Sequence, residues 1–324
     1  MCLSECSFLQ ETERIKMQIF TDITDFYSVQ ETAVAIGKFD GVHRGHRVIL
    51  DDLVKQKEDG LLACVFTFDP SPEIFFGLGD GKELSTRAEK RRLFQSAGVD
   101  ILIEFPFTEE AARTEPEAFV RDILIKQLHT SYVAAGPDLS FGSHGKGNFI
   151  LLQDLARHYR FDTRMIPKLT YEGVPISSTR IRQMIQEGRM EDAAACLGYP
   201  YRILDDVVHG TGIGKPVLGI PTMNQIPPAI KLLPPFGVYY SEVIVEGKTY
   251  KGMTNIGIKP TVSDEETPVA ETCLYDFDGS LYGKVAETRL LTFRRPEQKF
   301  ESVDALRAQM EKDMEAGRIY HGLT

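Results

Sequence analysis

The sequence predicts two domains: an α/β domain built on a parallel sheet, followed by a small antiparallel β domain with a C-terminal helix. Between about residues 33 and 195, short apolar runs alternate with longer segments of helical periodicity, as in β-α-β units. Residues 202–293 instead carry closely spaced runs rich in valine, tyrosine and threonine, as in small barrels or sandwiches. The length of 324 residues also suggests two domains, because single cores stop growing at roughly 250–300 residues.

Four runs in the first half have the composition of strands in a parallel sheet, because they are almost continuously apolar. Two segments of helical spacing between them end on a glycine, as helices often do. In such sheets ligands bind beyond the carboxyl ends of the strands, so we expect the chemistry in the loops after these runs. The predicted strands are 33–37, 61–68, 100–107 and 132–136, and the predicted helices are 45–60 and 85–98.

The second half ends in an amphipathic segment, residues 302–320, which we expect to form a helix capped by Ser302. We place the domain boundary so that residues 17–197 form the first domain and residues 198–324 the second. Residues 1–16 are polar and unpatterned, and we interpret them as a possible disordered leader. The predicted strands of the second half lie within 203–210, 237–257, 270–279 and 283–293.

The composition argues against several classes of protein, among them nucleic-acid-binding, membrane-bound and secreted ones. Lysine and arginine number 37 against 47 for aspartate and glutamate, and the net charge of −10 argues against nucleic-acid or anionic membrane partners. No apolar stretch reaches the ~18 residues of a spanning helix, and the N-terminus lacks the pattern of a secretion signal, so we expect a cytoplasmic protein. The five cysteines are scattered without paired spacing, which indicates neither a disulfide framework nor a structural zinc site.

The segment GKFDGVHRGH follows the first predicted strand and has the features of a tight turn that leads into a helix. Gly37, Gly41 and Gly45 permit close approach of the main chain, and a helix starting near Gly45 offers N–H groups to an anion. His43 and His46 could then donate hydrogen bonds to phosphoryl oxygens and stabilise developing charge. Two alternatives stay open: metal ligation, which needs a third ligand, and two histidines that are merely exposed at a helix start.

The segment ISSTRIR supplies hydroxyl groups at another predicted helix start. Ser177 or Ser178 would cap that helix in any protein, so the hydroxyl groups alone do not indicate a ligand. Arg180 and Arg182 lie in the first turn, where a positive charge opposes the helix dipole unless an anion is bound there. The two arginines therefore favour phosphate binding at this helix start.

A glycine-rich loop, residues 136–148, follows the last predicted strand of the first half and is too long for a simple turn. Within this loop, Asp138 could hydrogen-bond to a ligand and Phe141 could stack on its ring. The alternatives are an Asx turn for Asp138 and a role as a core anchor for Phe141.

The second half carries its own candidate phosphate segment, residues 209–228, with several closely spaced glycines and one lysine. It does not match the P-loop pattern, because Lys215 is followed by Pro216. Gly212 and Gly214 could still let the main chain cover a phosphate, and the alternative is an irregular connection between strands.

Thr222 and Asn224 offer a hydroxyl and an amide oxygen at the end of that segment. We expect an extended chain to point them to opposite faces, so that a turn would be needed to converge both on a hard cation such as Mg²⁺. Glu271 begins a strand that is otherwise apolar and aromatic, where a carboxylate near the core can serve as a general base. The alternative for Glu271 is a solvated position at the strand end.

Through GKFDGVHRGH, FTFDPSP, GPDLSFG and ISSTRIR, the first half resembles the adenylyltransferase module of the bacterial bifunctional riboflavin kinase/FAD synthetase family. The resemblance implies a Rossmann-like nucleotidyltransferase domain in which His43 and His46 hold the ATP phosphates. Ser178, Thr179 and Arg182 would clasp the β- and γ-phosphates, which leave as pyrophosphate when the FMN phosphate attacks the α-phosphorus. The other implied residues are Gly37, Phe39 and Asp40 for ATP and phosphate, and Asp138 and Phe141 for the flavin.

Through GIPTMN, NIGIKPT, ETCLYDFDGSLYGK and RPEQKF, the second half resembles the riboflavin kinase module of the same family. The resemblance implies a small antiparallel β-barrel domain with a C-terminal helix. In it, Thr222 and Asn224 would bind Mg-ATP, and Glu271 would take the proton from the ribityl 5′-hydroxyl. Gly212 and Gly214 would lie against the ATP phosphates.

We therefore expect a bifunctional enzyme that uses ATP and Mg²⁺ to convert riboflavin to FMN and FMN to FAD. Its catalytic residues would be His43, His46, Arg182 and Glu271. The expected partners are these small molecules, without nucleic acid or membrane, and the expected state is a monomer or weak homo-oligomer. Two alternatives stay open: a paralogue that keeps only one activity, and a flavin-binding regulator without turnover. The departures from the family pattern are Ser71, where a histidine is usual, and Asp205, where a glycine is usual.

Overall fold

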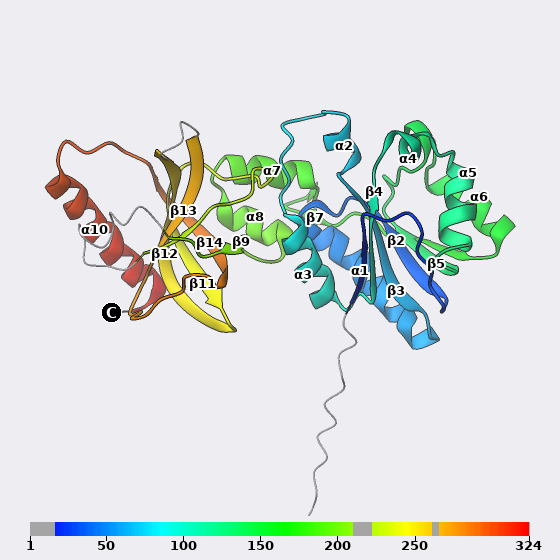
Figure 1. The fold of residues 1–324 in the computed structure, drawn as a ribbon, viewed down its shortest axis with the longest axis horizontal. Coiled ribbons are helices and arrows are strands. Elements are labelled where there is room, and N and C mark those ends of the chain that lie inside the picture. Colours follow the sequence, from blue (N-terminus) through cyan, green and yellow to red (C-terminus); the bar gives the residue numbers. More distant parts are fainter. Residues whose placement is uncertain (1–16, 210–221, 261–265, 324) are drawn as a thin grey trace, which may run out of the picture. The chain divides into compact units, whose positions relative to one another are not determined.

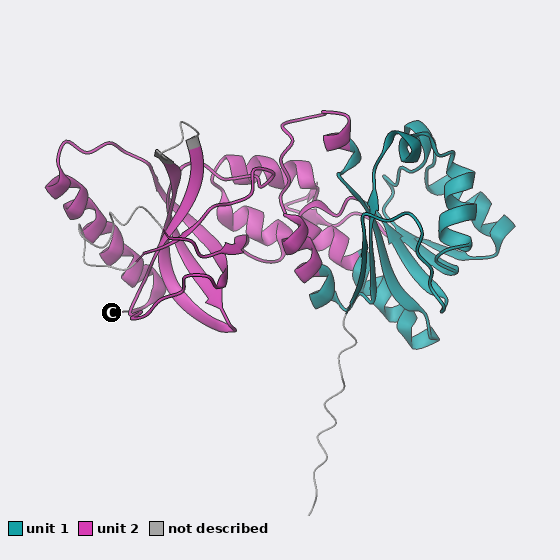
Figure 2. Ribbon diagram, viewed as in Figure 1, with its two compact units in different colours: residues 1–37, 49–72, 94–165 teal, residues 38–48, 73–93, 166–324 magenta. Residues whose placement is uncertain are grey.

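The structure, a computed structural model, describes residues 17–209, 222–260 and 266–323. The predicted leader and the predicted phosphate-covering residues Gly212 and Gly214 lie outside the described residues. The chain divides into two units, which Figure 2 shows in different colours. The first unit comprises residues 1–37, 49–72 and 94–165, and the second comprises residues 38–48, 73–93 and 166–324.

A six-stranded sheet forms the centre of the first unit (Figure 1). Its neighbouring strands are all parallel, in the order β1-β4-β3-β2-β5-β6. β2 is buried along its whole length, as expected for a strand whose sheet is covered on both faces. The strands are β1 (Gln18–Thr21), β2 (Thr32–Ile36), β3 (Leu62–Asp69), β4 (Ile101–Pro106), β5 (Thr130–Ala135) and β6 (Asp162–Met165).

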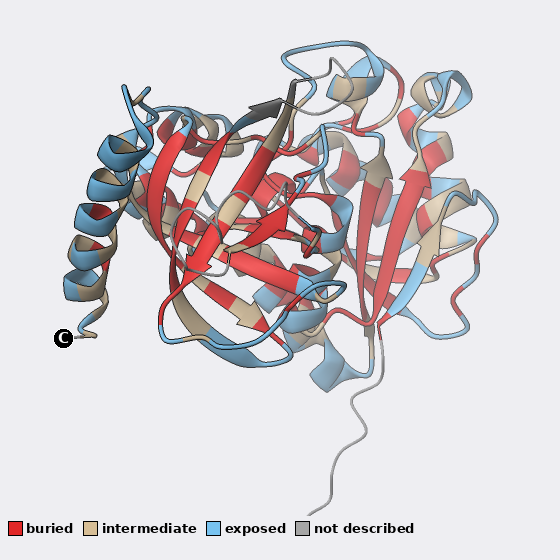
Figure 3. Ribbon diagram, turned by 60° about the vertical axis from the view of Figure 1, so that its left-hand side comes forward, coloured by how far each residue is buried: buried red, intermediate tan, exposed pale blue. Residues whose placement is uncertain are grey.

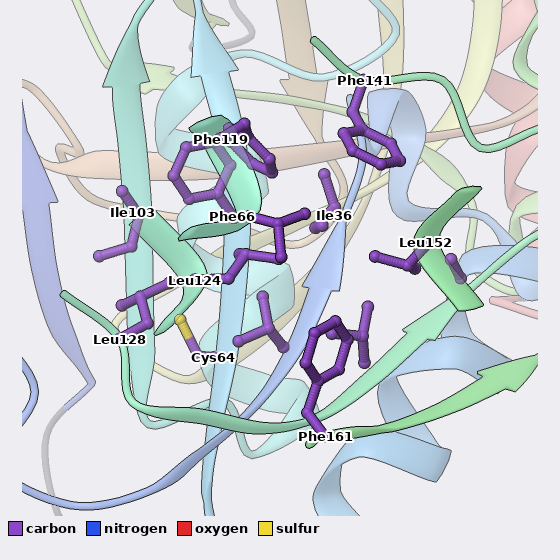
Figure 4. Packing of buried hydrophobic residues seen from close by; sticks show 14 of the residues in the cluster. Ile36, Cys64, Phe66, Ile103, Phe119, Leu124, Leu128, Phe141, Leu152 and Phe161 are labelled. Atoms are coloured by element: carbon purple, nitrogen blue, oxygen red, sulfur yellow. The ribbon is translucent and has the colours of Figure 1, made fainter. Parts of the chain in front are cut away.

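The core on one face of this sheet combines phenylalanine rings with aliphatic side chains (Figure 4). The ring of Phe66 on β3 lies 5.4 Å from that of Phe105 and 5.3 Å from that of Phe119, measured between centroids. The ring of Phe141 lies 5.8 Å from that of Phe119. Val65 points to the opposite face, because side chains alternate along a strand, and it is also completely buried. Both faces of the parallel sheet are therefore packed.

Helices occur in both units, and two of them span the division of the chain between the units. α1 and α3 each begin in the second unit and end in the first. The helices up to residue 197 are α1 (Arg44–Lys55), α2 (Pro72–Phe75), α3 (Arg87–Ala97), α4 (Glu109–Arg113), α5 (Pro116–Ala118), α6 (Phe149–Tyr159), α7 (Ser178–Gln186) and α8 (Met190–Leu197). Short 3₁₀ or π turns occur at η1 (Asp40–Val42), η2 (Gln56–Asp59), η3 (Phe119–Ile125) and η4 (Ser143–Gly145).

The second unit contains a six-stranded antiparallel sheet in the order β10-β13-β12-β11-β14-β9. Figure 3 shows buried residues along the strands of this curved sheet. A separate hairpin joins β7 (Thr170–Tyr171) and β8 (Val174–Pro175). The strands of the large sheet are β9 (Tyr201–Asp206), β10 (Thr222–Gln225), β11 (Gly237–Val245), β12 (Lys248–Pro260), β13 (Glu266–Leu274) and β14 (Val285–Pro296).

Contacts between its two edge strands close this sheet into a barrel. The Val208 N–H donates to the Asn224 carbonyl at 2.8 Å, immediately after β9. The completely buried Gln225 amide donates to the main-chain oxygens of Asp205 at 3.0 Å and Ala286 at 2.8 Å. Closure satisfies main-chain groups that an open edge would leave unpaired. Because Asn224 is one of the predicted metal ligands, its main chain takes part in the closure.

The chain ends in α10 (Val303–His321), which packs on the barrel. Ser302 caps this helix as predicted, since its hydroxyl accepts from the Ala305 N–H at 3.1 Å. The fully buried carboxylate of Asp313 accepts from Arg295 Nε of β14 at 2.7 Å. No helix of the described residues, α10 included, is both long enough and apolar enough to cross a membrane.

The structure confirms the predicted fold class, a parallel-sheet α/β domain followed by an antiparallel barrel with a C-terminal helix. The four strands predicted as buried apolar runs correspond to β2, β3, β4 and β5. The edge strand β6 was missed, because its sequence DTRM has no apolar run. The predicted domain boundary at residue 197 stays a prediction.

Gly237 provides a test of barrel packing. At this residue (φ 155°) a Cβ would lie 2.2 Å from the Arg295 carbonyl oxygen, so the main chain would have to move. We predict that Gly237→Ala lowers the free energy of unfolding by about 3 kcal/mol, the upper range for overpacking. Gly247, in the turn between β11 and β12 (φ 77°), has open space around it, so Gly247→Ala should cost only about 1 kcal/mol for its backbone conformation. Urea unfolding measures both, and equal losses would contradict the packing argument.

Candidate active sites

The turn after β2 is tight and mostly buried. Phe39, Gly41 and Val42 all have positive φ values, of 51°, 78° and 35°. A Cβ on Gly41 would lie 2.9 Å from Leu84 Cδ1, so both the backbone conformation and the packing favour glycine there. Phe39 is only 2% exposed and anchors the turn. The chain is therefore held in one conformation before α1 begins at Arg44.

His43 caps the start of α1 with its ring. Its Nδ1 accepts a hydrogen bond from the His46 main-chain N–H at 3.3 Å, and its carbonyl accepts from the Arg47 N–H at 2.9 Å. An imidazole that accepts at Nδ1 carries its proton on Nε2. A Cβ on Gly45 would lie 3.2 Å from this ring, so glycine leaves room for the ring over the helix start. Because Nδ1 accepts, Nε2 is the His43 ring nitrogen that is left to donate.

His46 stacks on His43, with ring centroids 3.7 Å apart and an angle of 13° between the planes. Its other side meets the edge of Phe39 at 5.1 Å. The His46 Nδ1 is buried and has no hydrogen-bond partner among the described residues. Burial, and the nearby charge that His43 would carry, hold the pKa of His46 well below its usual value. His46 therefore stays a neutral imidazole at neutral pH.

Asp40 ties this turn to two distant parts of the second unit. Its Oδ1 accepts from the main-chain N–H groups of Leu84 at 2.8 Å and Ser85 at 3.3 Å. Its Oδ2 accepts from Arg182 Nη2 at 2.7 Å. A carboxylate repels phosphate, and here it is paired with protein donors, so Asp40 has the contacts of a residue that positions the turn. Its predicted contact with ATP phosphates stays a prediction.

The hydroxyl cluster of the ISSTRIR segment lies beside this turn. Ser177 is the N-cap of α7 and accepts from the Arg180 N–H at 3.3 Å, which confirms the capping alternative. Ser178 donates from its hydroxyl to the Asp40 carbonyl at 2.9 Å. Thr179 is exposed on the first turn of the helix. The structure thus brings the hydroxyl cluster next to residues 37–46, here called the histidine turn. Phosphate binding by Ser178 and Thr179 stays a prediction.

The two arginines of the first turn have protein partners. Arg180 Nη1 donates to the carbonyls of Tyr171 at 2.9 Å and Val174 at 3.0 Å, on the β7–β8 hairpin. Arg182 pairs with the carboxylate of Asp40. Protein oxygens therefore accept from both arginines, so their place at this helix start does not by itself indicate an anion, and phosphate binding here stays a prediction. A catalytic role for Arg182 stays a prediction from the resemblance.

Three other predicted residues belong to the first unit. Phe141 is 3% exposed and lies in the aromatic core of Figure 4, as the core-anchor alternative expected. Asp138 is exposed in a turn that starts at Gly136. The Gly37 N–H donates to the Phe66 carbonyl at 3.1 Å, which continues the strand pairing of the sheet. Ligand binding by these residues stays a prediction, and Phe141 would have to leave the core to offer a ring face.

The predicted kinase residues project from one face of the barrel sheet. β10 is a continuous strand, and residues two apart along a strand lie on the same face, so Thr222 and Asn224 point together. The expectation that a turn would be needed to converge them is therefore wrong. Glu271 of β13 lies directly opposite Asn224 and shares that face. The Thr222 hydroxyl donates to Glu271 Oε1 at 3.0 Å, which leaves the hydroxyl lone pairs available to a cation.

Further polar groups lie next to Glu271 on the same face. Asn255 of β12 is opposite Glu271, and its amide donates to Glu297 Oε1 at 3.2 Å. Cys273, opposite Thr222, has its pKa raised to about 12 by burial and by the nearby Glu271 charge, so its thiol stays neutral. Sequence reasoning missed Asn255 and Glu297, although both lie in segments that carried the family resemblance, NIGIKPT and RPEQKF.

Oxygen donors dominate this second site. Among the described residues, no three His, Cys, Asp or Glu side chains form a group that could hold a metal ion. Thr222 and Asn224 offer a hydroxyl and an amide oxygen instead, with the Glu271 carboxylate beside them. Such a set fits a hard cation such as Mg²⁺, which prefers oxygen ligands and keeps several waters or substrate oxygens.

The residues that depart from the family pattern lie at buried or partly buried places. Ser71 is 8% exposed in the first unit. Burial raises the pKa of the Asp205 carboxyl, and the Asp205 carbonyl takes part in the barrel closure through Gln225.

Sequence reasoning also missed residues that support the first site. Arg182 donates to the Lys82 carbonyl at 2.6 Å and lies 3.7 Å from Asp80 Oδ1. Lys231, in the barrel half, donates from its ammonium to the Leu84 carbonyl at 2.7 Å. One signal could have indicated Lys231: it is a single charge within the otherwise apolar and proline-rich run IPPAIKLLPP.

Comparisons with known proteins agree with this division of sites. The family model described as FAD synthetase matches residues 26–180, which include the histidine turn and the start of α7. The family model described as riboflavin kinase matches residues 197–321, which include Thr222, Asn224 and Glu271.

Similar proteins span nearly the whole chain. A protein of Listeria monocytogenes is 37% identical over 303 residues, which are 92% of this chain and 95% of its own. One of Escherichia coli K12 is 36% identical over 294 residues, 90% of this chain and 93% of its own. Both are named bifunctional riboflavin kinase/FMN adenylyltransferase. A crystal structure from Streptococcus pneumoniae, named macrolide-efflux protein, is 30% identical with a TM-score of 0.82, and the match covers 94% of this chain and 99% of that one.

The lowered pKa of His46 predicts a pH dependence of stability. As the pH falls through the unfolded value of about 6.5, the unfolded chain binds a proton before the folded chain does. His46 therefore contributes stability above that pH, and this contribution is lost on acidification. We predict that the melting temperature of His46→Gln falls less between about pH 7.5 and about pH 5.5 than that of the wild type. The exposed His158 gives the control His158→Gln, and equal slopes for His46→Gln and wild type would refute this reading.

Proposed function

The chain belongs to the bifunctional riboflavin kinase/FMN adenylyltransferase family, and we propose that it converts riboflavin to FMN and FMN to FAD, with ATP as the second substrate of both reactions. The observation that carries this proposal is the presence of both sets of polar groups, each inside the region matched by the corresponding family model. The histidine turn lies in the first region, and the Thr222, Asn224 and Glu271 group lies in the second.

Adenylyl transfer is proposed for the histidine turn. An FMN phosphate oxygen attacks the α-phosphorus of ATP, the bond from the α-phosphorus to the bridging oxygen breaks, and pyrophosphate leaves. The Nε2–H of His43, together with His46 and the main-chain N–H groups at the start of α1, would hold phosphate oxygens and stabilise the charge in the transition state. Ser178, Thr179 and Arg182 would bind the leaving pyrophosphate. Neutral imidazoles suit this role, because the site needs hydrogen-bond donors and no proton is transferred to the histidines.

Phosphoryl transfer is proposed for the barrel site. Glu271 would take the proton of the ribityl 5′-hydroxyl, whose oxygen attacks the γ-phosphorus while ADP leaves. The hydrogen bond from Thr222 fixes the orientation of the Glu271 carboxylate. Thr222 and Asn224 would hold a Mg²⁺ ion, which supplies neutralising charge for the ATP phosphates when bound. Most of the rate enhancement in such reactions comes from positioning and electrostatic stabilisation.

Several finer expectations are proposals from composition and resemblance. They are a cytoplasmic location, a monomer or weak homo-oligomer, the need for Mg²⁺, and the absence of nucleic-acid and membrane partners. A flavin-binding regulator without turnover is the alternative of another class. The observed hydrogen bond between Thr222 and Glu271 favours turnover, because it orients a base and leaves hydroxyl lone pairs for a cation.

A direct assay tests both reactions. The protein is incubated with riboflavin, ATP and Mg²⁺, and the flavins are separated by chromatography. We expect FMN first and FAD after it. FMN without FAD would reject the adenylyltransferase proposal, and unchanged riboflavin would reject the kinase proposal. Addition of FMN in place of riboflavin isolates the second reaction.

His46→Ala should reduce FAD formation from FMN by roughly 10²–10³-fold, the usual effect of losing one transition-state donor. It should leave FMN formation from riboflavin within about 2-fold of wild type, since Glu271 and Thr222 are untouched. The exposed His158 on α6 provides the matched control His158→Ala. Loss of both activities in His46→Ala would contradict two separate sites.

Glu271→Gln should give the reverse result. The amide oxygen can still accept from Thr222, but it cannot take a proton, so FMN formation should fall by roughly 10²–10⁴-fold. FAD formation from added FMN should be unchanged. Glu311→Gln, at an exposed residue of α10, is the control for loss of one charge in this half. A Glu271→Gln enzyme with wild-type kinase activity would remove Glu271 from the mechanism.

A further inference from the structure

Residues 82–85, here called the bridging segment, form hydrogen bonds with Asp40 and with Arg182, two residues of the first candidate site. The N–H groups of Leu84 and Ser85 donate to Asp40 Oδ1 at 2.8 and 3.3 Å. The Lys82 carbonyl accepts from Arg182 Nη2 at 2.6 Å. The positions of Asp40 and Arg182 in the first site therefore depend on where this segment lies.

On its other side, the bridging segment is bound to residues 229–232 of the barrel half. The Glu83 N–H donates to the Ile230 carbonyl at 2.7 Å, and the Leu232 N–H donates to the Glu83 carbonyl at 2.8 Å. These are the hydrogen bonds of a short parallel β-bridge. Residues 230–232 therefore hold the bridging segment in an extended conformation through main-chain hydrogen bonds.

Lys231 adds a buried charge to this contact. Its ammonium donates to the Leu84 carbonyl at 2.7 Å and to Glu89 Oε2 at 2.7 Å, and it lies 4.2 Å from the centre of the Tyr201 ring. The side chains of Lys231 and Glu89 are each 1% exposed. Both the N–H and the carbonyl of Leu84 are therefore held by charged side chains, Asp40 on one side and Lys231 on the other.

Glu89 connects the same pair to two further main-chain groups. Its Oε2 accepts from the Thr86 N–H at 2.9 Å, and its Oε1 accepts from the Leu204 N–H of β9 at 3.2 Å. Removing charges from water is expensive, and a buried ion pair is often no more stabilising than apolar residues of similar size. What the pair contributes is fixed positions for its hydrogen-bond partners, because an ammonium requires its acceptors in defined places and an apolar side chain does not.

We propose that Lys231, although it lies in the region matched by the riboflavin kinase model, is a positioning residue for adenylyl transfer. It fixes the peptide group between Leu84 and Ser85, whose N–H donates to the Asp40 carboxylate, and through Asp40 it fixes Arg182 and the turn that carries His43. This proposal rests on the proposed adenylyltransferase activity. Lys231 takes no part in the kinase site.

The test compares Lys231→Met with the double variant Lys231→Met/Glu89→Gln. For each protein, kcat and KM are measured for FAD formation from FMN and for FMN formation from riboflavin, together with the melting temperature. Glutamine keeps one acceptor oxygen, which can take the bond from either the Thr86 or the Leu204 N–H, and the double variant removes the unpaired buried charge that Lys231→Met leaves. It does not restore the bond to the Leu84 carbonyl.

We expect Lys231→Met to lower kcat for adenylyl transfer by roughly 10²-fold, the loss typical of misplaced catalytic groups. KM for FMN and both kinase constants should stay within about 2-fold of wild type. The double variant should regain melting temperature relative to Lys231→Met while its adenylyl kcat stays low. The comparison separates positioning from stability. If Lys231→Met lost activity only because the protein is less stable, the double variant would regain adenylyl kcat together with the melting temperature.

Lys90→Met is the matched control. Lys90 is also mostly buried and donates at 2.9 Å to Glu83 of the bridging segment, but this bond goes to a side-chain carboxylate and not to a main-chain carbonyl. Its adenylyl kcat should change by less than about 3-fold. Recovery of adenylyl transfer in the double variant, or equal losses in both reactions, would overturn the proposal. A wild-type protein that forms no FAD would instead reject the proposed function itself.

Discussion

The Asp40 carboxylate holds the turn after β2 to the rest of the second unit. It accepts hydrogen bonds from Arg182 and from two main-chain N–H groups, of Leu84 and Ser85. Burial of a carboxylate is costly unless its oxygens are paired, so these donors must be in place for the turn to have this form. The hydroxyl of Ser178 donates to the Asp40 carbonyl as well. Both the side chain and the main chain of one residue therefore set the position of the histidines that follow.

In the proposed phosphate site, the two histidines are stacked rings, which disfavours their carrying a charge at the same time. Stacked at 3.7 Å, the imidazoles of His43 and His46 would repel each other if both were protonated. The Nδ1 of His43 accepts a hydrogen bond from the main-chain N–H of His46 at the helix start. Positive character comes instead from the N–H groups of α1, whose dipole favours an anion at that end. The site thereby gains donors without carrying two buried cations in the absence of substrate.

Much of the fold could be predicted from the sequence, because its signals are local. The apolar run of β3 and the serine that caps α10 depend on neighbouring residues only. The polar contacts that assemble the first site are not local. Asp40 and Arg182 are 142 positions apart, and Leu84 and Lys231 are 147 apart. Nothing in the sequence near either partner of such a pair indicates the other, so the sequence offered a bound anion as the partner of Arg182 and could not indicate Asp40.

For the candidate barrel site, the resemblance named the residues and strand geometry explains why they lie together, while their roles stay predictions. The expectation that Thr222 and Asn224 point to opposite faces of a strand was wrong, because residues separated by one position share a face. Phe141 shows the opposite limit. Whether an aromatic ring in a glycine-rich loop faces a ligand or the core depends on partners such as Phe119, which the loop sequence does not reveal.

The interleaved segments of the second unit affect the order in which the protein forms during synthesis. All segments of the first unit have been made once residue 165 is added, whereas residues 38–48 and 73–93 need partners from residues 166–324. Leu84 precedes Lys231 by 147 positions, which takes roughly 7–30 s at about 5–20 residues per second. Residues 38–48, which carry most of the histidine turn, are thus synthesised early but acquire their native partners late.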